Sequence, residues 1–239
     1  MSTDWSTLAA TLTRSLHLEV PPVAITFADQ VPDGVPGFGA PMSEPAADGR
    51  RGRVAAGCVF WVRALAETFA TAPEDHGNCS VGSLTHGLAS LDEVAGNDDV
   101  ASLLASGWVT AAMVPGIPTV SRRAEAIVYG PLAASAVDPD VVLLRVNGRQ
   151  LMVLSDAIPG LRIEGKPQCH IVAVAKEQRV AAASVGCALS RARTGMQPHE
   201  MTCAIPGADL PDVARRVQAT AAVDADVATY AARDARRFA

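Results

Sequence analysis

Two thiols and two imidazoles lie close together in the first third of the chain. Cys58 precedes the segment 74–86, which contains Cys79, His76 and His86. Deprotonated cysteine and neutral histidine bind soft or borderline metal ions, and a cysteine thiolate is also a nucleophile. The region therefore predicts a metal site or a site of thiol chemistry, and the residue types alone leave both open.

The second of these thiols is predicted to lie at the beginning of a short helix. Asn78 is a suitable N-cap, and a helix through His86 places Cys79, Gly82 and His86 on one face. Exposed backbone N–H groups and the positive end of the helix dipole stabilise a thiolate in the first turn. The small Gly82 leaves room there for a ligand. We therefore expect Cys79 to be a metal ligand or a nucleophile.

Two further cysteines lie far along the chain, at predicted junctions between elements. Cys187 follows a glycine, and Cys169 is followed by His170. None of these cysteines forms the C-x-x-C pair of zinc ribbons and small ferredoxins, so the fold itself must assemble any metal site. The simpler interpretation of each thiol is an ordinary buried cysteine. We prefer that interpretation for Cys203, which lies inside an apolar strand.

Three polar side chains are candidates for contact with a substrate. His76 follows Asp75 and is expected to transfer protons, although a surface Asp-His dipeptide has the same sequence. Arg191 and Arg193 lie in the segment 190–195, which is predicted to be a polar loop. Their planar guanidinium groups suit a carboxylate or a phosphate, although an exposed loop also tolerates arginines without a role.

The hydrophobic pattern indicates the elements that must position these residues. Predicted helices span 3–17, 58–69, 79–86, 97–106, 150–158 and 167–176, and two more lie at the C-terminus, 209–220 and 223–237. Predicted strands span 23–27, 126–129, 141–146, 179–185 and 202–205. Residues 30–53 are rich in Pro, Gly and Asp and are expected to form a long surface loop that acts as a lid.

The strands at 126–129 and 141–146 indicate the fold class. Both are continuous runs of apolar and β-branched residues, the pattern of strands that are buried on both faces. The second passes through a tight turn at Asn147-Gly148 into a helix. This order predicts an α/β fold, with a mixed α+β arrangement as the alternative, in which helices flank a central sheet. We expect residues 1–239 to form a single domain.

Composition excludes several classes of protein. The 239 residues include 20 Lys and Arg against 25 Asp and Glu, a net charge of −5, and no basic tract indicates nucleic-acid binding. Hydrophobic residues make up 49% of the chain, enough for a sizeable core. We find no signal-peptide pattern, no run of about 18 apolar residues that would cross a membrane, and an odd number of cysteines. A cytoplasmic protein with reduced thiols and no membrane contact is expected.

Short motifs spread along nearly the whole chain resemble those of one family. They are Pro21-Pro22-Val23-Ala24-Ile25, Ala56-Gly57-Cys58-Val59-Phe60-Trp61, Asp75-His76-Gly77-Asn78-Cys79-Ser80-Val81-Gly82, Asp138-Pro139-Asp140-Val141-Val142, Lys166-Pro167-Gln168-Cys169, Ser184-Val185-Gly186-Cys187-Ala188-Leu189-Ser190-Arg191 and the closing segment 230–237. In this order they resemble the bacterial and archaeal domain-of-unknown-function family 169, also called the ArCR family.

The resemblance implies positions rather than a reaction, because no activity is assigned to the family. It places Cys58, Cys79, Cys169 and Cys187 at recurrent cysteine motifs of the family. Cys203 lies outside these motifs. The segment 188–190 reads Ala-Leu-Ser where the family pattern has a small residue such as glycine or asparagine. This departure weakens the transfer of any role to that loop, but not the position of Cys187.

The leading hypothesis is an enzyme with an iron–sulfur cluster, most simply of the [4Fe–4S] type. Cys58, Cys79 and Cys187 would ligate it, and the fourth position would go to Cys169, to a histidine such as His86, or to the substrate. With three protein ligands, one iron is left as a Lewis acid for elimination, hydration or desulfurisation of a small polar, anionic molecule, a lyase-like reaction. Four protein ligands would favour electron transfer.

Two other classes of function stay open at this stage. The first is a non-catalytic binding or sensor protein whose thiols hold zinc, heme or nothing and respond to oxidation. The second is a cofactor-free enzyme that uses Cys79 with His76 or His86. The sequence is also compatible with a homo-oligomer, and it identifies neither the substrate nor the metal.

Overall fold

The computed structural model describes residues 3–38, 56–165 and 167–238. Most of the predicted lid, residues 39–53, lies outside the described residues. Its described part, 30–38, contains turns and one isolated β-bridge between Gly37 and Ala70.

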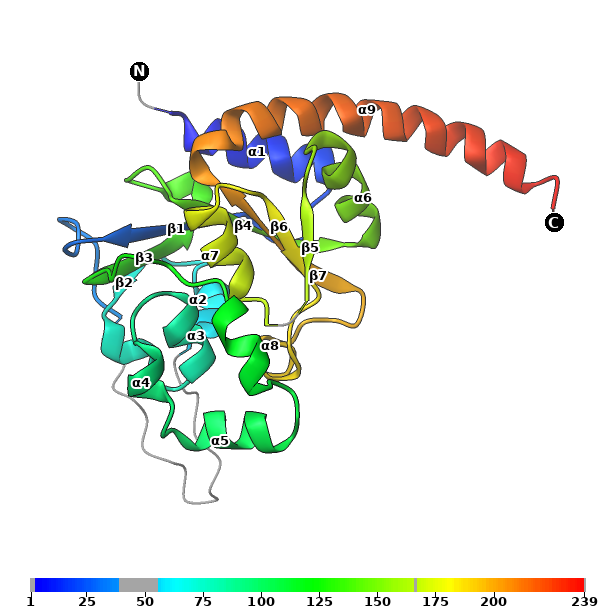
Figure 1. The fold of residues 1–239 in the computed structure, drawn as a ribbon. Helices are drawn as coiled ribbons and strands as arrows, with labels where there is room; N and C mark the ends of the chain where they lie inside the picture. The colour runs from blue at the N-terminus through cyan, green and yellow to red at the C-terminus, as the bar shows by residue number, and fades with distance from the viewer. Residues whose placement is uncertain (1–2, 39–55, 166, 239) are drawn as a thin grey trace.

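A seven-stranded sheet forms the centre of the described chain, in the order β2-β3-β1-β4-β7-β6-β5 (Figure 1). Its strands are β1 (Val23–Ala28), β2 (Phe69–Thr71), β3 (Ala126–Pro131), β4 (Val141–Asn147), β5 (Arg162–Glu164), β6 (Ala182–Ser184) and β7 (Glu200–Pro206). Neighbouring strands pair antiparallel, except β5 and β6, which are parallel. With helices on both faces, this is the mixed α/β architecture that the sequence predicts.

The α-helices are α1 (Trp5–Leu16), α2 (Gly57–Arg63), α3 (Ser80–Thr85), α4 (Leu91–Val94), α5 (Asp98–Ala105), α6 (Gly148–Ala157), α7 (His170–Glu177), α8 (Ala188–Thr194) and α9 (Leu210–Ala235). Short 3₁₀ helices span η1 (Pro73–His76), η2 (Ala111–Gly116), η3 (Leu132–Ala134) and η4 (Gly207–Asp209). The tight turn predicted at Asn147-Gly148 is the start of α6, where the Asn147 side chain accepts from the N–H of Gln150, 3.0 Å away.

The sheet separates two apolar cores. On one face, α1, α6 and α9 pack on Val142 and Leu144 of β4; on the other, α2 and α7 pack on Val141 and Leu143. Alternate residues of β4 therefore enter opposite cores, which explains why its sequence is continuously apolar. We call the first the packed face and the second the site face. Figure 1 shows α1 and α9 on one side and α2, α3 and α8 on the other.

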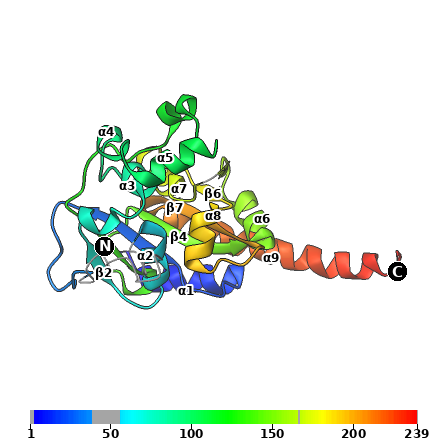
Figure 2. The ribbon, with the colours of Figure 1, turned by 90° about the horizontal axis from the view of Figure 1, so that it is seen from below.

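The prediction of two helices at the C-terminus is wrong, because α9 is one continuous helix. The segment 220–223 contains no Pro or Gly, and alanine, the best helix former, surrounds it. Only the first half of α9 contributes buried residues, from Leu210 to Val217. The second half extends away from the sheet (Figure 2).

Three other predicted boundaries need correction. The helix predicted over 58–69 ends at Arg63, and Phe69 begins β2. Pro167 does not enter the helix predicted after it, since α7 begins at His170. The segment 190–195, predicted to be a loop, lies largely in α8, which ends at Gly195 in the left-handed conformation (φ 63°). That helix carries both candidate arginines.

None of the helices in the described ranges is long and apolar enough to cross a membrane.

Candidate active site

Four cysteines from four separate segments line one small pocket of about 30 Å³ on the site face. They are Cys58, Cys79, Cys169 and Cys187. Each lies where a helix begins: Cys58 is the second residue of α2, and the other three precede α3, α7 and α8. Helix starts carry backbone N–H groups without helical partners, which are suitable donors to sulfur. The fold thus brings together the four cysteines that the sequence singles out.

The start of α8 shows how one sulfur is held. The N–H of Ser190 donates to Cys187 Sγ at 3.3 Å, and the Ser190 hydroxyl accepts from the N–H of Cys187 at 3.2 Å. The thiol here replaces the hydroxyl of the usual Ser or Thr in a capping box. The sequence therefore did contain a signal for α8 that the prediction of a loop overlooked: Cys187 as the N-cap residue and Gly195 as the C-cap residue.

Arg193 is the cation of the pocket. Its side chain extends from α8 and hydrogen-bonds to the thiols of both Cys58 and Cys79. Partial burial lowers the pKa of Arg193, but negative charge on these two sulfurs more than compensates, so its pKa is raised. A fixed positive charge at this point favours the thiolate forms that bind metals.

Burial opposes ionisation of the thiols in the protein without metal. It raises the pKa of Cys58 to about 11, with a further contribution from Cys79, while Arg193 acts in the opposite direction. Burial likewise raises the pKa of Cys169, to which Thr85 hydrogen-bonds. Both groups are thus neutral thiols near pH 7, and all five cysteines of the chain are free.

The start of α3 differs by one residue from the prediction. Cys79 itself is the N-cap residue, and α3 ends at Thr85, so His86 follows the helix. A Cβ atom on Gly82 would lie 3.5 Å from Cys79 Sγ, so this glycine does leave space beside the sulfur. Asp99 on α5 fixes the helix start by accepting from the N–H and the hydroxyl of Ser80, at 3.0 and 2.7 Å.

The two candidate histidines lie behind the cysteine pocket rather than in its lining. His76 is 1% exposed and His86 is fully buried, with 5.8 Å between their ring centroids. Both approach Gly57: a Cβ atom there would be 2.9 Å from His86 Cε1 and 4.0 Å from His76 Nδ1. His76 and His86, predicted to be a base or a ligand, are thus buried behind the thiols and do not line the pocket.

Hydrogen bonding assigns the tautomer of His76. The Thr71 hydroxyl donates to the carbonyl of Ile127 at 3.1 Å, so its oxygen accepts from His76 Nε2–H, 2.9 Å away. Within the described residues, His76 Nδ1 and both ring nitrogens of His86 have no hydrogen-bond partner. Burial lowers the pKa of both histidines, for His86 to about 4, and a charge on His86 lowers that of His76 further. Both rings are neutral at pH 7.

Arg191 is placed differently from Arg193. Its guanidinium donates to three backbone carbonyls, those of Val185 and Glu200 at 2.6 and 3.0 Å and that of Gln197 at 2.5 Å. These bonds tie α8 to the strands on either side of it. Arg191 therefore fixes the backbone around α8, and of the two arginines only Arg193 lines the cysteine pocket.

Three residues of the pocket carried no signal in the sequence. Trp108, Asp99 and Leu103 come from or follow α5. They reach the pocket only through the tertiary packing of that helix. Cys203, by contrast, is fully buried in β7 on the packed face, as expected for a cysteine in an apolar strand.

The thiols do not form a site for a single ion. Within the described ranges, no three or more His, Cys, Asp or Glu side chains form a group that could hold a metal ion. Tetrahedral zinc requires sulfurs about 2.3 Å from the metal and hence within about 4 Å of one another. An iron–sulfur cluster is larger than one ion and accepts ligands that stand farther apart. The pocket offers four thiols, an N–H donor to Cys187 Sγ and the guanidinium of Arg193.

A family model matches most of the chain. The model of the domain-of-unknown-function family 169, described as uncharacterised ArCR, matches residues 11–216. The matched range includes all four cysteines of the pocket and Arg193. No curated protein and no solved structure matches the chain.

Proposed function

The chain belongs to the uncharacterised ArCR family, and we propose that it is an enzyme whose Cys58, Cys79 and Cys187 hold an iron–sulfur cluster, with Cys169 beside them. The observation that carries the proposal is the convergence of four free cysteines, from four helix starts, on one pocket. An ordinary core cysteine packs against apolar side chains, as Cys203 does. Four thiols sharing one pocket with an arginine are instead suited to binding a soft ligand.

The surrounding residues have separate tasks in this proposal. Arg193 compensates the negative charge that Cys58 and Cys79 acquire as ligands, and the N–H of Ser190 does the same for Cys187. Cys169 is the most deeply buried thiol of the pocket and the one whose ionisation burial opposes most. We therefore assign Cys58, Cys79 and Cys187 as ligands and leave Cys169 or the substrate for the fourth position.

A bound cluster with an open position supplies a Lewis acid for elimination, hydration or desulfurisation, whereas four protein ligands restrict it to electron transfer. Arg193 is then the cation that faces an anionic substrate at the pocket. His76 and His86 do not line the pocket, but both lie against Gly57, which does. We expect the substrate to be a small polar anion.

Metal and sulfide analysis tests the proposal. The protein is purified without oxygen, reconstituted with iron and sulfide, and compared with Cys58→Ser, Cys79→Ser, Cys187→Ser and the matched control Cys203→Ser. We expect broad visible absorption and acid-labile sulfide in the wild type and in Cys203→Ser, and loss of both in the three ligand variants. A folded, colourless wild type without iron or sulfide after reconstitution would refute the proposal.

The same pocket also supports a second function, reversible thiol oxidation. Arg193 bonds to both Cys58 and Cys79, so these two thiols are the first pair to test for a disulfide. Mild oxidation of metal-free protein followed by mass spectrometry identifies that bridge. Its formation in a protein that fails to bind iron would favour a redox sensor.

The geometry gives less support to a cofactor-free Cys–His enzyme. Such a mechanism needs an imidazole within hydrogen-bonding reach of the nucleophilic sulfur. His76 is instead bonded to Thr71, and His86 has no hydrogen-bond partner among the described residues.

A further inference from the structure

We propose that a second pocket, bounded by α3, α4, α5 and η2, binds an aliphatic chain that ends in an uncharged hydrogen-bond donor such as a hydroxyl. We call it the apolar pocket, and its volume is about 330 Å³. Figure 1 shows α3, α4 and α5 close together on the site face. None of the four cysteines of the cysteine pocket lines the apolar pocket, so the proposal does not rest on the iron–sulfur cluster.

The lining of the apolar pocket is almost wholly aliphatic. Leu84 of α3, Val94 of α4 and Leu103 of α5 contribute to it. Among the described residues that line it, only Ser80 and Asp92 are polar. Water in such a space forms few hydrogen bonds, and apolar cavities in proteins stay dry or take up apolar molecules. The lining therefore favours a hydrocarbon.

The helices around the apolar pocket lack a core of their own. Val100, Leu103 and Leu104 lie at the spacing of one face of α5, and all three line the pocket. None of the described residues of α5 or η2 is buried, and Leu104 is 43% exposed. A short helix depends for its stability on burial of its apolar face. A hydrocarbon bound between α5 and α3 would supply that burial.

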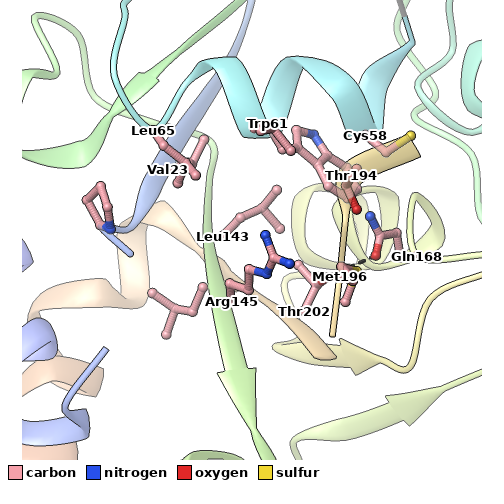
Figure 3. A pocket seen from close by; sticks show the side chains of 13 residues that line it. Val23, Cys58, Trp61, Leu65, Leu143, Arg145, Gln168, Thr194, Met196 and Thr202 are labelled. Carbon is pink, nitrogen blue, oxygen red and sulfur yellow. Dashed lines mark hydrogen bonds between the residues drawn. The ribbon is translucent and has the colours of Figure 1, made fainter. Parts of the chain in front are cut away.

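The volume sets the length of the chain. Protein interiors seldom contain voids larger than a water molecule, so a space of about 330 Å³ is exceptional. An apolar cavity of about 150 Å³ binds benzene, so a space about twice as large accommodates roughly ten to twelve carbon atoms. The pocket beside Cys58 in Figure 3 is less suitable, because it has only about 50 Å³ and its wall includes Arg145 and Gln168.

The polar groups of the lining indicate the end of the chain. The Ser80 hydroxyl is already paired, since it donates to Asp99 at 2.7 Å and accepts from the side-chain N–H of Asn97 at 2.8 Å. Asp92 is exposed and is the only charged side chain among the described residues of the lining. It would repel a carboxylate, and an ammonium group would lose hydration against aliphatic walls. A hydroxyl can donate to Asp92 without either disadvantage.

The apolar pocket adjoins the cysteine pocket. Val81 and Leu103 line both of them. Ser80, which lines the apolar pocket, directly follows Cys79 in the sequence. A bound chain would therefore be separated from the thiols by side chains that the two pockets share.

The test is a titration of metal-free protein, labelled in its leucine and valine methyl groups, with decanol. We expect saturable shifts of the Leu84 and Leu103 signals, because both side chains line the pocket. Leu154 is the internal control, since it is fully buried on the packed face. Hexanol, which leaves part of the pocket empty, should bind at least roughly tenfold more weakly. Decanoate, which has a similar length but a negative charge, should bind at least several-fold more weakly than decanol.

A variant that fills the pocket tests the same site from the side of the protein. Ala95 lines the pocket, so Ala95→Phe adds a ring at its wall and should weaken decanol binding at least roughly tenfold. Ala105 on α5 is exposed and does not line the pocket, so Ala105→Phe should leave binding unchanged. If Ala95→Phe does not fold, Ala111→Phe replaces it, because Ala111 of η2 also lines the pocket.

Several results would overturn the proposal. They are the absence of saturable shifts at Leu84 and Leu103, equal shifts at Leu154, equal affinity for hexanol or decanoate, and unchanged affinity in a folded Phe variant of the lining. Shifts that follow the protein concentration but not decanol would assign the pocket to a second copy of the chain, and would overturn it too. Failure of the protein to bind iron would leave this result unaffected, because the titration uses metal-free protein.

Discussion

The two faces of the sheet differ in how completely their buried polar atoms are paired. The core of the packed face consists of apolar side chains and Cys203. Within the described chain, the buried side-chain atoms without a hydrogen-bond partner come from Trp61, His76, His86, Tyr129, Arg145 and His170. Trp61 and Tyr129 belong to the core of the site face. His76 lies beside Tyr129, and His86 lies beside Gly57. Arg145 is on the same side of β4 as Leu143, which also belongs to that core.

This difference separates stability from function within one small protein. Each unpaired buried polar group destabilises the folded state by about 1–3 kcal/mol. An apolar core does the opposite, and α1, α6 and α9 pack theirs against the packed face of the sheet. Unpaired polar groups thus gather on the site face, and apolar burial on the packed face stabilises the fold that holds them.

The comparison predicts its largest effect on the packed face. Leu154 on α6 is fully buried there, so Leu154→Ala should lower the free energy of unfolding by about 2–5 kcal/mol. Met152 on the same helix is 48% exposed, and Met152→Ala should change it by less than about 0.5 kcal/mol. Urea unfolding measures both. Iron bound per folded molecule should be the same in both variants, and loss of iron in a stable Leu154→Ala protein would contradict the separation.

Residue periodicity was sufficient to predict most of the fold. The spacing of Trp5, Leu12 and Leu16 predicted α1, and the continuous runs at β3 and β4 predicted strands covered on both faces. A continuous run does not reveal strand direction, because helices cover both sides of this antiparallel sheet as they do of a parallel one. The prediction of two helices in place of α9 was wrong for a related reason. Polar residues interrupt the hydrophobic pattern of the sequence there, but they do not end the helix.

The sequence singled out the four cysteines that share the pocket, but not the environment of the residues around them. The four cysteines were recognisable by residue type and by family motif, and the fold places all of them in one pocket. The burial of His76 could not be predicted, since the sequence Asp75-His76 equally suits a surface turn. Nor could the sequence distinguish Arg193, which bonds to thiols, from Arg191, which bonds to carbonyls. Desolvation and long-range pairing arise only from tertiary packing.

The two buried histidines predict a loss of stability in mild acid. Burial lowers the pKa of His86 to about 4 from an ordinary value of 6.5, so below pH 6.5 the unfolded chain binds a proton that the folded chain does not. Stability is therefore complete above pH 6.5 and falls as the pH drops toward 4, by about 3 kcal/mol for His86 alone. The pKa of His76 is lowered in the same direction.

The free energy of unfolding measured between about pH 6.5 and 5 checks this, because most carboxylates, with pKa values near 4, remain ionised there in both states. His86→Asn should reduce the slope of that free energy against pH, whatever its effect on stability at pH 7. His199 is exposed, and His199→Asn should leave the slope unchanged. A slope in His86→Asn equal to that of the wild type would show that His86 is not buried in its neutral form.

The smallest effect, and the most local, is predicted at Gly57, which separates the thiols from the histidines. A methyl group there would lie 2.9 Å from Cε1 of the enclosed His86, so Gly57→Ala should lower the free energy of unfolding by about 1–3 kcal/mol. Gly148 opens α6, and a methyl group on it would meet no atom within 4 Å, so Gly148→Ala should be neutral or stabilise by up to about 1 kcal/mol. Because Gly57 precedes Cys58, the first variant should also bind less iron. Unchanged stability and iron content in Gly57→Ala would mean that His86 moves freely, and the two layers of the site face would then be independent.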